Sequence, residues 1–208
     1  MNPGVADVAT SSERRVVTGP GWITERLCGV EFRISPESFF QTNTLQAEQL
    51  FGVVLDEAGV EEADLVHDLY SGAGSISLLL AGAVEKVVGY ELSTEAVADA
   101  EANAARNGIS NASFVAGDLA ETIASVSERP DVLICDPPRS GMHEKVVERV
   151  IELAPPRIVH VSCNAHTAAR DLARLTHHGY ELVRARPVDL FPHTPHVECV
   201  FTLERRPS

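Results

Sequence analysis

Short apolar runs alternate with amphipathic segments along the chain from residue 64 onward. Each run has the length and composition of a buried strand, and each is followed by a stretch with helical spacing. This alternation predicts a parallel sheet with helices on both faces. The predicted strands cover 65–70, 87–92, 112–117, 131–136 and 157–162, and the predicted helices cover 73–81, 94–107, 118–127, 143–153 and 166–178.

The two ends of the chain depart from that alternation. Residues 16–34 contain β-prone stretches around Gly19-Pro20-Gly21, which predicts a short strand pair, and a helix is expected over about 44–59. Residues 180–189 and 197–204 are β-like, and the linker between them is too short for a crossover helix. We therefore expect the chain to end in an antiparallel hairpin at the sheet.

Length and composition favour one compact α/β domain. With 208 residues and 44% hydrophobic content, the chain can bury one substantial core. No apolar run approaches the roughly 20 residues that cross a bilayer, and the N-terminus does not resemble a signal peptide. The four cysteines are far apart and include no C-x-x-C pair, so neither a zinc nor an iron–sulfur site is expected. These features predict a cytoplasmic protein without membrane or metal partners.

The charge balance is unusual for a protein that binds nucleic acid. Thirty acidic and 17 basic residues give a formal net charge of −13, which repels a polyanion at long range. All but two of the basic residues are arginines, which can bind phosphate in a bidentate manner. Any RNA is therefore expected to bind this chain weakly when it acts alone. A surface adapted for solubility explains the same acidity.

A glycine-containing turn follows the first strand of the alternation, in DLYSGAGSISLLLA at 68–81. Gly72 and Gly74 let a ligand approach the main chain closely, although Ser77 replaces the third glycine of the dinucleotide-binding fingerprint. Glu91 ends the next strand, where a carboxylate can accept bonds from ribose hydroxyls, and Asp118 ends the third. Together these features indicate a cofactor that contains adenosine. Alternatively, the turn and Glu91 are structural, and Asp118 caps the next helix.

A second motif is DVLICDPPRSG at 131–141, in which a buried-looking strand delivers Asp136 to its carboxyl end. The two prolines that follow stiffen the loop. Ligands of open α/β sheets bind outside the carboxyl ends of the strands, so Asp136 is expected to share a crevice with the glycine turn and Glu91.

The third motif, RIVHVSCNAHTAARD at 157–171, places Cys163 between a strand and a helix. Amides at the helix N-terminus are expected to lower the pKa of the thiol and favour the nucleophilic thiolate. Inert burial is the alternative, and it is our interpretation of Cys28, Cys135 and Cys199.

The fourth motif is HTPHVECV at 193–200, in which Glu198 interrupts an apolar β pattern. Strand alternation alone could place Glu198 on a solvent-facing side of the sheet. The neighbouring His193 and His196 lack the accompanying carboxylate or cysteine spacing of a metal site.

Taken together, the four motifs resemble the uridine-5 RNA methyltransferase family, which acts on transfer RNA and on large ribosomal RNA. The resemblance covers about 30–204. It includes ISPESFFQTNTLQAEQL at 34–50, similar to the family's F-x-Q-x-N segment, and NAARNGISN at 103–111. It implies a Rossmann-like class I methyltransferase fold, with a mostly parallel seven-stranded sheet and an antiparallel C-terminal hairpin, and S-adenosyl-L-methionine as cofactor.

The resemblance also implies roles for individual residues. Cys163 would be the nucleophile that adds to carbon 6 of uracil, and Glu198 the base that removes the proton from carbon 5. Asp136 could hold either the uracil edge or the cationic part of the cofactor. The residues implied to bind the cofactor or organise its site are Gln41, Tyr70, Gly72, Gly74, Ser75, Glu91, Asp118 and Asp136.

The sequence departs from the family pattern at the N-terminus. Family members commonly carry an RNA-binding barrel and a fuller central domain, and neither fits before residue 30. We expect residues 1–15 to be a disordered leader, 16–43 a remnant of the central domain, and 44–208 the methyltransferase domain. RNA binding would then depend on a longer chain or a separate partner. The resemblance leaves open the target RNA and the oligomeric state.

Three other functions fit some of the same residues. A cytosine-5 RNA methyltransferase also needs a cysteine nucleophile and a glycine-rich turn. An amine-directed methyltransferase could use Asp136 and its prolines without covalent catalysis, in which case Cys163 is dispensable. A non-catalytic module could bind the cofactor and act only through protein contacts.

Overall fold

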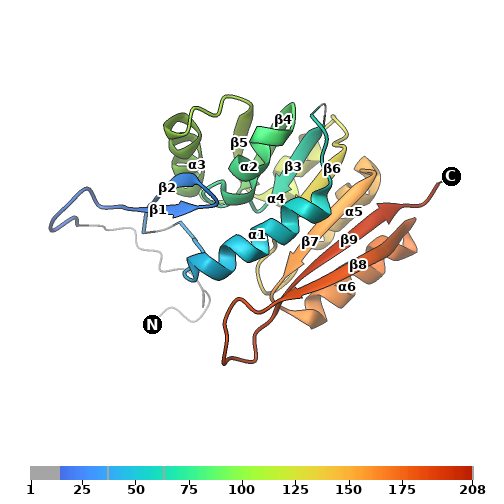
Figure 1. Ribbon diagram of the computed structural model, residues 1–208. Helices are drawn as coiled ribbons and strands as arrows, with labels where there is room; N and C mark the ends of the chain where they lie inside the picture. The colour runs from blue at the N-terminus through green and yellow to red at the C-terminus, as the bar shows by residue number, and fades with distance from the viewer. Residues whose placement is uncertain (1–14, 37, 63, 208) are drawn as a thin grey trace.

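A seven-stranded sheet forms the centre of the computed structural model, which describes residues 15–36, 38–62 and 64–207 (Figure 1). The strand order within these residues is β5-β4-β3-β6-β7-β9-β8. The strands are β3 (Leu65–Leu69), β4 (Lys86–Glu91), β5 (Ala112–Ala116), β6 (Val132–Cys135), β7 (Arg157–Ser162), β8 (Tyr180–Val188) and β9 (Glu198–Arg205).

The strand directions match the sequence prediction. Strands β3 to β7 are mutually parallel, as expected for strands joined by crossover helices. Strand β9 is antiparallel to β7 and lies between β7 and β8, to which it is also antiparallel. The predicted fold class, a mostly parallel sheet with an antiparallel C-terminal hairpin, is therefore confirmed.

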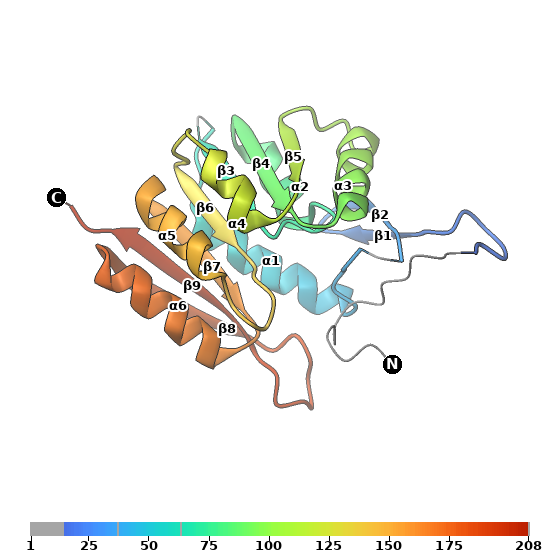
Figure 2. The same cartoon turned by 180° about the vertical axis from the view of Figure 1, so that it is seen from behind.

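Helices cover both faces of this sheet. One buried cluster joins α1, α2 and α3 to the strands, and a second joins α4, α5 and α6 to the opposite face (Figure 1 and Figure 2). The helices are α1 (Thr44–Ala58), α2 (Ser75–Leu80), α3 (Thr94–Arg106), α4 (Leu119–Thr122), α5 (Glu144–Leu153) and α6 (Ala165–His177); the short 3-10 helices are η1 (Ala81–Ala83) and η2 (Ile123–Ser125).

Local polar residues determine where the longer helices begin. Asn43, Ser93 and Asn164 are the N-caps of α1, α3 and α6, and each side chain accepts a hydrogen bond from a first-turn amide. Gly59 ends α1 in the left-handed conformation that glycine adopts readily. Among the described helices, none combines the length and apolar character needed to span a bilayer.

The N-terminal strand pair is present, but its turn lies elsewhere than predicted. Strands β1 (Ile23–Leu27) and β2 (Val30–Ile34) are antiparallel and joined at Cys28 and Gly29. Both linking residues have positive φ, 49° and 85°, the backbone that tight two-residue hairpins require. The predicted turn at Gly19-Pro20-Gly21 instead precedes β1 in an irregular segment. The predicted leader at 1–15 lies outside the described residues except for Arg15.

Candidate active site

The turn between β3 and α2 is built from residues with unusual backbone conformations. Tyr70, Gly72 and Gly74 have φ values of 67°, 54° and 84°. A positive φ is uncommon for a residue with a bulky side chain, and such residues concentrate at functional sites. A Cβ added to Gly74 would lie 3.0 Å from Phe114 and 3.1 Å from Ala100. The glycine at 74 therefore permits both the turn and the close packing of α2 on its neighbours.

Asp68, which the sequence analysis treated only as a strand end, is a buried acid beneath this turn. Its side chain is 1% exposed, and Oδ2 accepts a hydrogen bond of 2.6 Å from Ser77 Oγ. Burial, together with the charges of Asp136 and Glu91, raises the pKa of Asp68 to about 7. Its Oδ1 has no hydrogen-bond partner among the described residues. The signal for this residue was an acid interrupting the apolar run LVHDLY directly before a glycine turn.

A small cavity opens beside the glycine turn. Its volume is about 50 Å³, smaller than the roughly 300–1,000 Å³ of pockets that enclose a whole ligand. Five of the eight residues predicted to form the cofactor site line it, together with Asp68 and Ser71. Those five are Gln41, Tyr70, Gly72, Ser75 and Asp136. The structure thus brings together residues from three distant segments of the chain.

The Glu91 side chain forms a hydrogen bond with the glycine turn and does not line the cavity. Its carboxylate accepts hydrogen bonds from the backbone amides of Gly72, at 3.0 Å, and Ser93, at 2.8 Å. Each oxygen keeps a second lone pair that can accept a further bond. Asp118 is exposed and caps α4 by accepting a bond of 2.8 Å from the Ala120 amide. The capping interpretation of Asp118 is thus confirmed, and it does not line the cavity.

Cys163 and Glu198 lie at the same end of a pair of antiparallel strands. Strands β7 and β9 are paired from Arg157 with Glu204 to Ser162 with Cys199. Cys163 follows Ser162 in a bend, one residue beyond this register, and Glu198 is the first residue of β9 at the same end of the pair. The carboxylate of Glu198 is close enough to raise the pKa of the Cys163 thiol. Glu198 is only 7% exposed, so the alternative interpretation that it faces solvent is wrong.

The electrostatics of this pair differ from the sequence prediction. Burial raises the pKa of Glu198 to about 7, with a further upward contribution from Asp136 and a downward one from Arg139. The pKa of Cys163 is also raised, first by burial and then by Glu198, while Arg139 opposes the shift. The expectation that the helix N-terminus lowers the pKa of this thiol is therefore wrong. Burial is the largest cause of the upward shift, and the Glu198 carboxylate, 35 residues further along the chain, adds to it.

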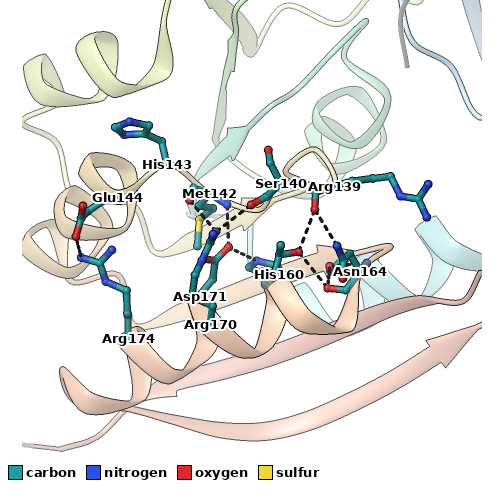
Figure 3. A network of polar contacts seen from close by, with 12 residues as sticks. Arg139, Ser140, Met142, His143, Glu144, His160, Asn164, Arg170, Asp171 and Arg174 are labelled. Carbon is teal, nitrogen blue, oxygen red and sulfur yellow. Dashed lines mark hydrogen bonds and ion pairs between the residues drawn. The ribbon is translucent and has the colours of Figure 1, made fainter. Parts of the chain in front are cut away.

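The loop after β6 is held between α6 and the linker of the C-terminal hairpin. The carbonyl of Arg139 accepts bonds from Asn164 Nδ2, at 3.1 Å, and Thr167 Oγ1, at 3.2 Å. Its guanidinium contacts His196 Nδ1 at 2.9 Å. Figure 3 shows the carbonyl directed at Asn164 and the guanidinium pointing away from α6.

Asp171 fixes the far end of the same loop from within α6. Its carboxylate accepts bonds from the Met142 amide, at 2.8 Å, and from Arg170 Nε, at 2.9 Å (Figure 3). His160 Nε2 lies 3.8 Å from Asp171 Oδ2, and both side chains are 1% exposed. These contacts lower the pKa of Asp171 despite its burial. The loop that carries Asp136 and Arg139 is therefore anchored at both ends.

The cysteines other than Cys163 occupy three different environments. Cys135 is buried, Cys199 is half-buried, and Cys28 is exposed at the hairpin turn, contrary to the expectation of burial. Over the part of the chain that the structure describes, no group of three histidine, cysteine or acidic side chains is arranged to hold a metal ion.

Comparison with known proteins identifies the family. The model of the tRNA (uracil-5-)-methyltransferase family matches residues 4–206. The chain belongs to this family. The family resemblance predicted from the four motifs is thereby confirmed.

Relatives and solved structures support this assignment. An uncharacterized RNA methyltransferase from Clostridium tetani is 43% identical over 99% of this chain and 45% of its own length. One from Chlorobaculum tepidum is 44% identical over 95% of this chain and 42% of its own length. The structure of Pyrococcus abyssi tRNA (uracil-54, C5)-methyltransferase, in complex with S-adenosyl-L-homocysteine, has a TM-score of 0.78 and 38% identity over 89% of this chain and 45% of that one. The chain thus spans less than half the length of these proteins.

Proposed function

We propose that this chain is the catalytic domain of an enzyme that methylates carbon 5 of a uridine in RNA, with Cys163 as nucleophile and Glu198 as base. The observation that carries this proposal is that Cys163 and the buried Glu198 lie at the same end of the β7–β9 pair, where the carboxylate raises the pKa of the thiol. The family match supports the sequence predictions of an enzyme and of S-adenosyl-L-methionine as its methyl donor.

The described residues fit this cofactor. The unpartnered Oδ1 of Asp68 and the carboxylate of Asp136 offer negative charge to the cationic amino acid end. The free lone pairs of Glu91 suit ribose hydroxyls. Gln41, Tyr70 and Ser75 would complete the wall around the amino acid end, while Asp118 would lie near the adenine. When bound, S-adenosyl-L-methionine supplies the methyl group that carbon 5 receives.

Cys163 and Glu198 would divide the reaction between them. The Cys163 thiol releases its proton to solvent, and the thiolate forms a bond to carbon 6, which makes carbon 5 nucleophilic. After carbon 5 has gained the methyl group, Glu198 takes the carbon 5 proton. The bond between Sγ and carbon 6 then breaks, which restores the double bond and the thiolate. Cys163 and Glu198 lie within the folded domain at the ends of interior strands. A uridine stacked between its neighbours could not reach them, so the target base would have to be unstacked.

The substrate and the domain organisation belong to the same proposal. Ribosomal and transfer RNA are both candidates, and transfer RNA is tested first because the Pyrococcus abyssi protein is a tRNA (uracil-54, C5)-methyltransferase. Residues 44–208 would be the methyltransferase domain and 16–43 a part of a central domain. The net charge of −13 implies weak RNA binding by this chain alone. The enzyme would act in the cytoplasm.

The test is a denaturing-gel assay with 5-fluorouridine-substituted transfer RNA and S-adenosyl-L-methionine at low salt. Fluorine at carbon 5 prevents proton removal, so the adduct accumulates as a shifted band. Wild-type protein and Cys199→Ala should give the band, and Cys163→Ala should not. Cys199 is a matched control because it lies on the same strand pair, directly opposite Ser162.

Each rival function predicts a different result in this assay. A band with 5-fluorocytidine RNA alone would indicate the cytosine-5 enzyme. Methylation that survives Cys163→Ala would indicate the amine-directed enzyme. Cofactor binding without a band or methyl transfer, on ribosomal as well as transfer RNA, would leave the non-catalytic module.

A further inference from the structure

Helix α3 and its C-cap residue present three polar side chains, about one per turn, to strand β2 and the residue that follows it. They are Asp99, Asn103 and Asn107, which are spaced by four residues, and they contact the backbone at Ser35, Arg33 and Glu31. Four helical residues rise about 6 Å and two strand residues about 6.6 Å, so the two spacings match. The helix and the strand lie side by side (Figure 1 and Figure 2). We call these three side chains the α3 ladder.

Each asparagine of the ladder makes the same pair of hydrogen bonds to β2 that the backbone of a neighbouring strand would make. Asn103 Oδ1 accepts a bond of 2.6 Å from the Arg33 amide, and its Nδ2 donates to the Arg33 carbonyl at 3.1 Å. Asn107 repeats the pattern at Glu31, with bonds of 3.0 and 2.8 Å. A primary amide carries its acceptor and its donor on two separate atoms, so one side chain can pair with both the N–H and the C=O of a strand residue.

Asn103 and Asn107 each make a third bond, but to different parts of the fold. Asn107 Nδ2 donates to the Asn103 carbonyl at 2.8 Å, within the same end of the helix. The second Nδ2 hydrogen of Asn103 reaches the carbonyl of Ala73 at 3.2 Å, and the side chain is fully buried. Ala73 lies between Gly72 and Gly74 in the turn that borders the cavity. One amide therefore connects strand β2 to the glycine turn.

Asp99 extends this connection toward the opposite cavity wall. It is 1% exposed and accepts bonds from the amide and hydroxyl of Ser35, at 2.8 and 2.9 Å, and from the hydroxyl of Ser38, at 2.7 Å. Ser38 precedes Gln41 by three residues, and Gln41 lines the cavity. The α3 ladder thus holds the segment that leads to one wall and the turn that forms the other.

We propose that Asn103 is a positioning residue that fixes the glycine turn relative to the segment carrying Gln41, and so sets the affinity for the cofactor. The inference rests on the proposed function, because the cavity must be the cofactor site. Asn103 touches neither substrate nor cofactor and acts only through Ala73 and Arg33. A purely structural role would instead be shared with Asn107, since both anchor β2 in the same way.

The test compares Asn103→Ala with Asn107→Ala in the full chain, by calorimetric titration with S-adenosyl-L-homocysteine. Each substitution removes side-chain bonds to β2, so both should lower the melting temperature. Only Asn103→Ala loosens the glycine turn, and the dissociation constant should rise roughly tenfold, against less than about twofold for Asn107→Ala. Hydrogen exchange of the amides at 72–75 should accelerate in the first variant alone. Asn103→Ser, which keeps a small polar group, replaces Asn103→Ala if that variant does not fold.

Equal dissociation constants and equal exchange in the two variants would overturn the inference, because Asn103 would then act only as an anchor for β2. A failure of the proposed function is distinguishable. In that case the wild-type chain would bind no S-adenosyl-L-homocysteine, or would bind it without a Cys163-dependent adduct on either RNA.

Discussion

The site has a cofactor side and a catalytic side, and they differ in how far apart their residues lie along the chain. On the cofactor side, Asp68, Gly72 and Glu91 lie within 24 residues and belong to one strand–helix–strand unit. On the catalytic side, Cys163 and Glu198 are 35 residues apart and meet only because β9 inserts between β7 and β8. The glycine turn and Glu91 of the first side come from one local unit, to which Gln41 and Asp136 are added from distant segments. The second side depends wholly on the order of strands in the finished sheet.

The two sides also differ in what their charged groups do. Glu91 and Asp68 have backbone or hydroxyl partners, so they hold the turn in place. Burial brings the pKa of Glu198 to about 7, as it does that of Asp68, but Glu198 lies near Cys163, where it can give and take a proton near neutral pH. Rigid recognition and proton transfer are thus separated along the same sheet edge.

Glu198→Gln should produce the largest effect and confine it to the catalytic side. The amide cannot take the carbon 5 proton, so resolution of the methylated adduct on uridine RNA should slow by about 10²–10⁴-fold while the adduct still forms. Decay of the adduct band over time measures this rate. Glu204→Gln, at the other end of the same strand, is the control and should resolve at the wild-type rate. Rapid release by the Glu198 variant would remove it from the role of base.

Glu91→Ala should affect the cofactor side alone. It removes an acceptor for two backbone amides and for the ribose, so the dissociation constant for S-adenosyl-L-homocysteine should rise roughly 10- to 100-fold. Saturating cofactor should restore adduct formation with 5-fluorouridine RNA. Glu101→Ala, an exposed residue on α3, is the control. A defect that saturating cofactor does not rescue would mean that the two sides are not separable.

The pH dependence of adduct resolution should reveal the ionisation of Glu198. A base works in its charged form, which is present above its pKa of about 7, so the rate should fall roughly tenfold per pH unit below that value. Arg139→Ala should move the profile to higher pH, because the guanidinium lowers the pKa of Glu198. Single-turnover rates from pH 5.5 to 8.5 measure this. A flat profile would show that Glu198 does not limit the step.

Gly141→Ala should give the smallest effect and test the loop anchor. Gly141 has φ of 79°, and a Cβ there would meet the Arg170 guanidinium and lie 2.6 Å from Asp171 Oδ2. We expect a loss of about 1–3 kcal/mol in the free energy of unfolding. Thermal unfolding would show it as a drop of roughly 2–4 °C per kcal/mol. Gly82→Ala, which has open space around it, should unfold within about 1 °C of wild type. An unchanged melting temperature at Gly141 would mean that the anchor is not rigid.

Sequence reasoning succeeded where the determinants are local. The apolar runs of β3 to β7 and the caps at Asn43 and Ser93 set element positions to within a few residues. The helix predicted over 118–127 is shorter in the structure, because α4 ends at Thr122 and a 3-10 turn follows it. The hairpin turn was predicted at Gly19-Pro20-Gly21 but lies at Cys28-Gly29. Both segments contain glycine, and which of them becomes the turn depends on which strands pack on α3.

The rest of the site could not be read from the sequence because it depends on contacts across the fold. The direction of the Cys163 pKa shift is set by burial and by Glu198, neither of which the motif around the cysteine reveals. Asn103 was visible only as part of NAARNGISN, and nothing in that motif indicates a bond to Ala73. The residue roles themselves stay predictions until the variants are measured.

The pairing of β7 with β9 has a consequence for how this site tolerates insertions and deletions. Because the pairing of Ser162 with Cys199 sets which residue of β9 lies nearest Cys163, the length of the 189–197 linker does not affect that choice. Residues could be added there without moving Glu198. Removing a single residue inside β9 would instead exchange the two faces of the strand and bring a neighbour to the position nearest Cys163. Among related proteins, insertions and deletions should therefore occur in the linker, while the length of β9 should stay constant.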